Sequence, residues 1–148
     1  MSRLRKFLAL PLADRGCLVE AGLWLGLARL AILVLPFRWI ARGLGRQMVR
    51  SPEDAGAASA ALLDRISWAV ATASRHLPWD CLCLAQALAA KAMLKRRGMP
   101  STLYLGLAKD GEAQLQAHAW LRCGKRILTG QRGMAGFTVI ATFAEDGK

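Results

Sequence analysis

The chain has 148 residues, of which 54% are hydrophobic and 21% are charged, and its formal net charge at pH 7 is +11. With no internal repeat or low-complexity tract, this composition predicts a single folded domain with a real core. The positive charge indicates attraction either to an acidic peptide or partner, or to nucleic acid or membrane. Because the basic residues are scattered without a recognition-helix or ribonucleoprotein motif, we expect no nucleic-acid partner.

Residues 1–13 combine basic residues with a short apolar stretch, as signal peptides do. However, Pro11 lies within that stretch, no small-x-small cleavage site is clear, and Asp14 and Arg15 follow directly. We therefore predict that the chain has no export signal. With four cysteines, such a chain is expected to keep reduced thiols in the cytoplasm.

Residues 18–37 are strongly apolar and approach the length of a membrane span, but they include Glu20 and Arg29. Each charge costs about 2.5–3.5 kcal/mol near the centre of a bilayer, so a buried or interfacial helix fits better than a span. Trp24 and Trp39 lie near the ends of this segment, and a basic stretch follows it. Three interpretations stay open: a core helix, a surface for a partner or an anionic membrane, and a true span.

The composition changes near residue 50. We predict an N-terminal apolar and basic helical element in residues 1–50 and a core in residues 51–148, together forming one compact domain. The core is expected to begin with an Ala-rich helix from Ser51 to about Ser74, with Pro52 at its first position. Its packing face consists of Leu62, Leu63, Ile66 and Val70.

The next predicted helix is clearly bounded. Asp80 is a good N-cap, and Gly98 and Pro100 close the C-terminus after a run of basic residues. Cys83 then falls in the first turn, where unpaired N–H groups and the positive end of the helix dipole favour thiolate over thiol. We interpret Cys83 as a candidate nucleophile, although free cysteines are often simply small buried residues.

Beyond Pro100, the apolar residues change from helical to alternating spacing. This pattern predicts an antiparallel sheet with strands at residues 102–107, 114–122, 126–129 and 137–143. In the second strand, Gln116, His118 and Trp120 share the face opposite to the alanines and leucines. His118 is therefore placed to line a cleft and to serve as a base for a cysteine.

Zinc binding is the other chemistry that the cysteines and His118 could support. Four residues are of the ligand type: Cys81, Cys83, His118 and Cys123. Structural zinc sites usually use C-x-x-C knuckles, whereas Cys81 and Cys83 are two residues apart and would point about 200° apart on a helix. We therefore expect no metal site.

Three segments in order carry a more specific signal: residues 78–88, residues 96–106 and Ala117-His118-Ala119-Trp120. Together they resemble the leader peptidase of lasso-peptide biosynthesis, in particular the stand-alone transglutaminase-like half of the split B protein, which is related to the C-terminal domain of the microcin-processing B protein. The resemblance implies an α+β fold with a transglutaminase-like or papain-like cysteine protease core, in which helices precede a small antiparallel β-meander.

The resemblance also implies a function and partners. Cys83 would cleave the leader from a lasso precursor peptide with His118 as general base, and an asparagine-synthetase-like cyclase would close the macrolactam. A PqqD-like protein would recognise the leader in trans, with the N-terminal apolar segment as our candidate docking surface. We expect a cytoplasmic protein without a cofactor, with contact to the inner-membrane surface left open. The alternative is a noncatalytic peptide- or partner-binding scaffold of the same fold.

Related enzymes usually place an aspartate on the strand after the histidine, and here that strand offers Thr129. The group that orients the imidazole is therefore Thr129, a backbone carbonyl, or an acid from elsewhere such as Asp110. For the substrate cleft we predict four residues: Trp79, Gln86, Gln116 and Trp120.

Overall fold

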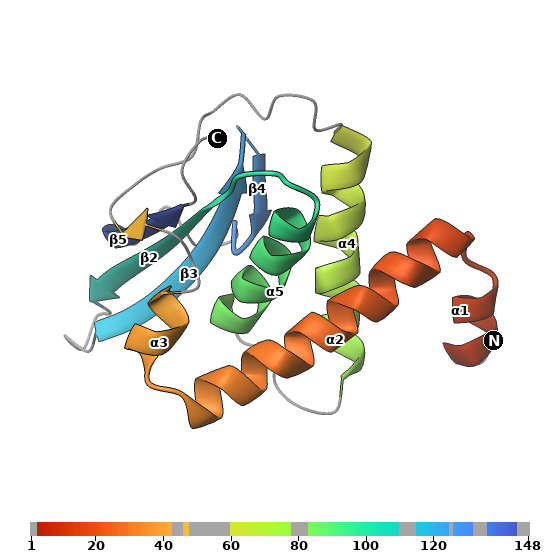
Figure 1. Cartoon of the computed structure of the whole chain (residues 1–148), viewed down its shortest axis with the longest axis horizontal. Coiled ribbons are helices and arrows are strands. Elements are labelled where there is room, and N and C mark those ends of the chain that lie inside the picture. Colours follow the sequence, from red (N-terminus) through yellow and green to blue (C-terminus); the bar gives the residue numbers. More distant parts are fainter. Residues whose placement is uncertain are drawn as a thin grey trace.

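The computed structural model describes residues 3–42, 46–47, 60–77, 83–109, 115–124, 126–131 and 136–144. The helices are α1 (Arg3–Leu8), α2 (Leu12–Val34), α3 (Phe37–Arg42), α4 (Ala60–His76) and α5 (Cys83–Arg96). The strands are β1 (Arg46–Gln47), β2 (Thr102–Lys109), β3 (Leu115–Cys123), β4 (Arg126–Thr129) and β5 (Thr138–Ala144). They form one antiparallel sheet in the order β1-β5-β2-β3-β4, with α2, α4 and α5 together on one side of it (Figure 1).

The central helix is α5, which lies between the sheet and α2, while α4 packs beside it and also contacts β4 (Figure 1). Seven of its 14 residues are buried, and four of these are alanines, whose small side chains allow close approach on both sides. Its buried Lys91 donates hydrogen bonds from Nζ to the carbonyl oxygen (2.8 Å) and the hydroxyl (3.1 Å) of Ser101, which satisfies a charged group that would otherwise be costly to bury.

The outer helices pack through regular apolar stripes. Helix α2 buries Cys17, Ala21, Leu25 and Ala28, and α4 buries Leu63, Ile66, Ala69, Val70 and Ala73. Both sets recur at helical spacing, so each helix presents one face to the shared core. The sheet completes that core with Leu103 and Leu121, which are cross-strand partners and are fully buried.

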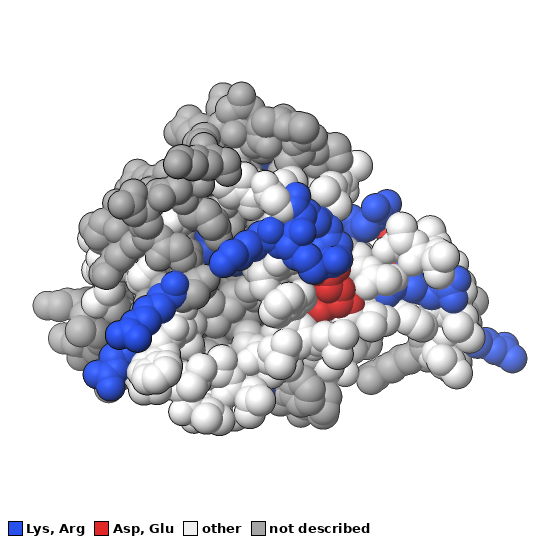
Figure 2. Space-filling model, in the orientation of Figure 1, with Lys and Arg blue, Asp and Glu red and all other residues white. Residues whose placement is uncertain are grey.

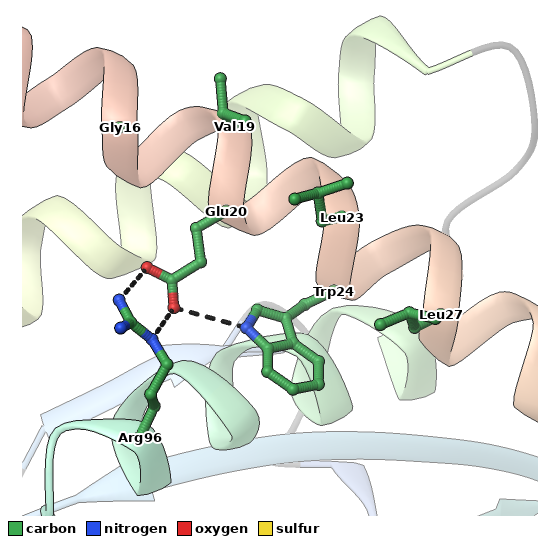
Figure 3. A pocket seen from close by; sticks show the side chains of 7 residues that line it. All are labelled: Gly16, Val19, Glu20, Leu23, Trp24, Leu27 and Arg96. Atoms are coloured by element: carbon green, nitrogen blue, oxygen red, sulfur yellow. Dashed lines mark hydrogen bonds and ion pairs between the residues drawn. The ribbon is translucent and has the colours of Figure 1, made fainter.

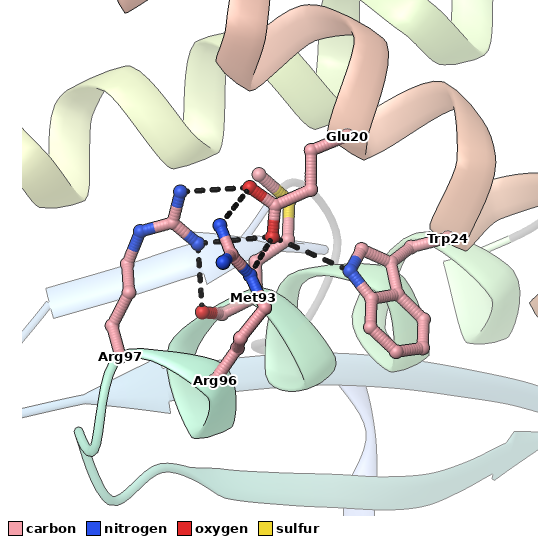
Figure 4. A network of polar contacts seen from close by, with 5 residues as sticks. All are labelled: Glu20, Trp24, Met93, Arg96 and Arg97. Atoms are coloured by element: carbon pink, nitrogen blue, oxygen red, sulfur yellow. Dashed lines mark hydrogen bonds and ion pairs between the residues drawn. The ribbon is translucent and has the colours of Figure 1, made fainter.

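Glu20 links α2 to the C-terminal end of α5 through ion pairs and hydrogen bonds (Figure 4). Its carboxylate accepts hydrogen bonds from Arg96 at 2.8 Å and from Arg97 at 2.8 and 3.1 Å, and a longer one from the Trp24 indole at 3.4 Å. Partial burial acts to raise the pKa of Glu20, but the hydrogen bonds and charges of the two arginines outweigh it and lower the pKa from 4.5 to about 2.

The α+β plan is confirmed, and the four expected strands appear as β2 to β5. The apolar helix runs over Leu12–Val34 instead of residues 18–37, because Pro36 cannot continue a helix and disfavours the helical conformation at Leu35. The expected helix starts at Pro52 and Asp80 lie outside the described residues.

Candidate active site

Cys83 is the first residue of α5, and its side chain is partly exposed. Its sulfur accepts a hydrogen bond from the backbone N–H of Ala119 at 3.4 Å. Ala119 lies in β3 directly after His118. The fold therefore brings the candidate nucleophile to the peptide next to the candidate base, across 36 positions of sequence.

The thiol occupies an open edge of the sheet. Strand β4 pairs with β3 only from Leu121 onward, so no described strand lies beside Ala119 on that side. Ala119 faces Leu105 on β2, and its N–H points toward Cys83 while its carbonyl lies close to Gly130. Both peptide groups thus point away from β2, as in a pair without mutual hydrogen bonds, and they leave the sulfur in the place of a strand partner.

The imidazole of His118 is held at the same edge. Its Nε2 lies 2.7 Å from the carbonyl oxygen of Gly130, just beyond the end of β4. Since a carbonyl only accepts hydrogen bonds, Nε2 must carry a proton, and in the neutral ring Nδ1 then keeps the lone pair that a base requires. The ring also packs against Trp120 and Phe137, with centroid distances of 5.7 and 5.1 Å.

Thr129 does not make this orienting contact. It is the cross-strand partner of Leu121, so it shares the core face with Leu121 while His118 belongs to the other face. Its hydroxyl is buried without a hydrogen-bond partner among the described residues. Of the expected alternatives, the geometry favours the backbone carbonyl, supplied by Gly130; Asp110 lies outside the described residues.

A β-bulge sets the position of Gly130. Leu121 pairs with Thr129, but the adjacent Arg122 pairs with Ile127, so β4 has one extra residue between these pairs. Such a bulge bends the strand and changes where the following residues point. Gly130 then adopts φ of 74°, and a β-carbon on it would lie 2.4 Å from the carbonyl oxygen of Ala119. Only glycine fits this close approach.

The predicted cleft residues have different surroundings. Trp120 is only 6% exposed and stacks on Tyr104 with a centroid distance of 5.5 Å, so it is a buried wall behind the imidazole. Gln116 is exposed on β3 and Gln86 is half-buried on α5, whereas Trp79 lies outside the described residues.

Two residues near His118 were not anticipated from the sequence. Phe137, directly before β5, contacts the imidazole. Gly106 is the cross-strand partner of His118, and a β-carbon there would lie 2.9 Å from both Phe137 and the Trp120 ring. The isolated glycine in the first predicted strand was the available signal, because such a glycine often marks close approach of another group.

Within the described ranges, no group of three or more His, Cys, Asp or Glu residues could hold a metal ion. Cys17 and Cys123 are buried in the core, while Cys81 lies outside the described residues. Burial is the main reason that the pKa of the Cys17 thiol is raised, and the nearby Arg97 opposes it.

A hollow of about 410 Å³ lies away from Cys83, between α2 and the C-terminal end of α5. Figure 3 shows its lining, where Trp24, Leu23 and Leu27 lie beside the ion pair of Glu20 and Arg96. A larger hollow of about 570 Å³ lies between α1, α2 and α4. Both hollows belong to the N-terminal side of the molecule, so they do not extend the edge that holds Cys83 and His118.

Comparison with known proteins identifies the family of the chain. Searches among curated proteins and among solved structures found no match. The sequence profile of the transglutaminase-like superfamily matches residues 31–142, which include Cys83, His118 and all strands from β2 to β4. Together with the helices that precede an antiparallel sheet, this match confirms the expected fold. The chain belongs to the transglutaminase-like superfamily.

Proposed function

We propose that this protein is a cysteine peptidase that removes the leader from a lasso-peptide precursor. The observation that supports it most is the edge of β3, where the Cys83 sulfur meets the Ala119 N–H and the Gly130 carbonyl orients His118. Membership of the transglutaminase-like superfamily, which includes cysteine peptidases, agrees with this chemistry. The lasso precursor as substrate is supported by the sequence resemblance alone.

In the proposed reaction, Nδ1 of His118 takes the proton of the Cys83 thiol, and the thiolate attacks the carbonyl carbon between leader and core. The tetrahedral intermediate collapses when the C–N bond breaks, and His118 returns the proton to the leaving amine, which is the new N-terminus of the core. Water then hydrolyses the thioester with His118 as base, which releases the leader and restores the thiol.

Two backbone groups would support this reaction. The N–H of Ala119 faces the sulfur and would hold it when it is charged. The N–H of Cys83, the first residue of α5, has no helical acceptor among the described residues and would be available to a developing oxyanion. These donors need no side chain, so they are independent of the missing aspartate.

The proposal includes partners in trans. A PqqD-like protein would present the leader, and an asparagine-synthetase-like cyclase would consume the freed core amine. We place the reaction in the cytoplasm, where the four cysteines of the chain are expected to stay reduced.

The test is intact-mass analysis of a precursor peptide incubated with the full chain and its recognition partner. We expect cleavage by wild type and by Cys123→Ala, which removes a buried sulfur on the same strand as His118, and loss of about 10³-fold or more with Cys83→Ala or His118→Ala. If Cys83→Ala cuts as fast as wild type, the peptidase assignment fails and the noncatalytic scaffold becomes the better description.

A further inference from the structure

The outer face of α2 is apolar and exposed along its whole length. We define the outer stripe of α2 as six side chains: Leu12, Val19, Leu23, Leu27, Leu30 and Val34. Each of them is 51–76% exposed. At 100° per residue they lie within an arc of about 80° that holds no charged residue, and they extend for about 33 Å.

This exposure is concentrated in one part of the molecule. Among the described residues, 14 large apolar side chains are exposed, and 11 of them lie between Leu4 and Trp39. Single exposed apolar residues are normal on a protein surface, whereas a continuous stripe marks an interaction site.

The charges around the stripe are basic. The two acids between Leu4 and Arg42 are Asp14, which is paired with Arg65 at 2.9 Å, and Glu20, which is paired with Arg96 and Arg97. Exposed cations lie toward both ends, at Lys6 in α1 and at Arg38 and Arg42 in α3. Figure 2 shows a band of uncharged surface along α2, bordered mainly by Lys and Arg side chains and at one point by an acidic patch.

The end of the stripe near α3 carries an aromatic side chain. Trp39 is 54% exposed, and the Arg42 guanidinium carbon lies 5.7 Å from the centre of its ring. Tryptophan beside arginine is typical of segments at the level of lipid headgroups.

The hollow between α1, α2 and α4 adjoins the same face and shares Val19 with the stripe. Its wall is mainly apolar, with Phe7, Trp68 and Leu77, and Lys6 lies at its side. An apolar hollow of about 570 Å³ beside a lysine suits an acyl chain with an anionic headgroup.

By length and composition alone, α2 could cross a membrane. Its inner face, however, forms part of the core through Ala21 and Leu25, and Glu20 ties it to α5. Crossing a bilayer would require breaking this packing and burying Glu20 in hydrocarbon. If α2 instead lies in the plane of the membrane surface, its core packing and the ion pairs of Glu20 both stay intact.

We propose that α1, α2 and α3 dock this protein on an anionic lipid bilayer, with the outer stripe of α2 at the boundary between headgroups and acyl chains and the basic side chains against lipid phosphates. The basic borders favour anionic lipid over a second copy of this equally basic chain. The docking is independent of the chemistry at Cys83, and it assigns the apolar N-terminal segment to lipid in place of the PqqD-like partner expected from the sequence.

The test is co-sedimentation of the full chain with vesicles of phosphatidylcholine alone or of phosphatidylcholine mixed with phosphatidylglycerol. We expect at least about tenfold stronger partition onto the mixed vesicles, with a decrease in high salt. The double variant Leu23→Glu/Leu30→Glu should lose at least about tenfold, since each charge enters the apolar layer. Ile140→Glu, at an exposed position on β5, is the matched control and should bind like wild type.

Circular dichroism and thermal unfolding of each variant show that it is folded, and Arg38→Glu/Arg42→Glu tests the electrostatic part without touching the stripe. The proposal is overturned if wild type does not bind the mixed vesicles or if the Leu23→Glu/Leu30→Glu variant binds them equally well. It is also overturned if wild type is a dimer that this variant dissociates while vesicles bind neither, because the stripe is then an interface between copies.

Discussion

Gly130 is the residue on which the candidate site depends most after Cys83 and His118. Its carbonyl fixes the imidazole tautomer, and its α-carbon packs against the backbone of the strand that bears the histidine. A main-chain carbonyl can orient a neutral histidine, but it carries no full charge to stabilise the imidazolium. We therefore expect a working but slower base than one held by a carboxylate.

Gly130→Ala should impair both folding and cleavage. The substitution places a side chain at φ of 74° and a β-carbon 2.4 Å from the Ala119 oxygen, so the turn must move and the carbonyl leaves His118. We expect a loss of about 3 kcal/mol in the free energy of unfolding and at least about a tenfold loss in cleavage rate. Urea unfolding and single-turnover cleavage measure the two effects.

Gly98→Ala is the matched control, because Gly98 has a similar φ of 72° but no atom within 4 Å of an added β-carbon. It should cost only about 1 kcal/mol, the conformational penalty alone, and leave the rate unchanged. Equal effects of the two substitutions on stability and rate would contradict the role assigned to the Gly130 carbonyl.

Thr129→Val tests whether the Thr129 hydroxyl or the Gly130 carbonyl orients the His118 imidazole. Valine has nearly the same shape, and the Thr129 hydroxyl is buried without a hydrogen-bond partner among the described residues. We expect an unchanged cleavage rate and stability that is equal or about 1 kcal/mol higher, since an unsatisfied buried group is removed. A rate as low as that of His118→Ala would instead make Thr129 the third member of the site.

At the scale of residues, functional side chains can be predicted from the sequence more readily than functional backbone groups. Cys83 and His118 could be proposed because reactive side chains at a helix start and on a polar strand face leave a pattern in the sequence. The Gly130 carbonyl could not, because its position depends on the extra residue in β4 and every residue carries a carbonyl. The contact of Phe137 with His118 depends on β5 pairing with β2, which is a tertiary arrangement.

At the scale of elements, α5 connects two regions of the molecule. Its first residue is Cys83, and its last turn holds Arg96, which with the next residue, Arg97, binds Glu20 of α2. Its alanines bring it close to the sheet and to the outer helices at once. The position of the thiol at the edge of β3 is therefore supported by the same helix that secures the N-terminal element.

Glu20→Gln should destabilise the protein in a pH-dependent way. The lowered pKa of Glu20, about 2 instead of 4.5, corresponds to about 3 kcal/mol in full. Because the Arg96 side chain is 59% exposed and solvent screens it, we expect about 2 kcal/mol at pH 7. A depressed carboxyl pKa stabilises the fold above the unfolded value, so the difference between variant and wild type should shrink as the pH falls from 4.5 to about 2.

Asp14→Asn is the control on the same helix. The Asp14–Arg65 pair is a single contact at 2.9 Å with both side chains more exposed than Glu20, and such pairs contribute about 0–1 kcal/mol. Urea unfolding across this pH range compares the two variants. A Glu20→Gln effect that is small at pH 7 or constant with pH would show that the network in Figure 4 does not secure α2.

The elements themselves were largely predictable because period and end signals are local. Alternation located the strands, and Gly98 and Pro100 marked the end of α5 within two residues. The two-residue strand β1 was not predicted, since among the described residues it pairs only with β5, far away in the sequence. Local sequence carries no signal for so short a partner.

For the molecule as a whole, the open question from the sequence was whether the apolar N-terminal segment is core, surface or membrane span. The structure assigns its two faces differently. The inner face of α2 joins α4, α5 and the sheet in one cluster, and the outer stripe stays exposed. A hydropathy run cannot show this division, because both faces are equally apolar and only packing distinguishes them.

Replacing neighbouring leucines on the two faces of α2 tests that division. Leu25 is fully buried, so Leu25→Ala should cost about 2–5 kcal/mol through lost burial and the cavity left behind. Leu23 is 66% exposed only two positions away, so Leu23→Ala should change stability by less than about 0.5 kcal/mol. Urea unfolding followed separately by circular dichroism and by tryptophan fluorescence should give one coincident transition for wild type and both variants.

If Leu25→Ala is as mild as Leu23→Ala, α2 is not part of the cooperative core, and its packing no longer argues against a membrane-spanning helix. If Leu25→Ala is severe, the helix that bears the outer stripe unfolds together with the helix that carries Cys83, and the proposed docking on lipid through one face would then stabilise the site behind the other.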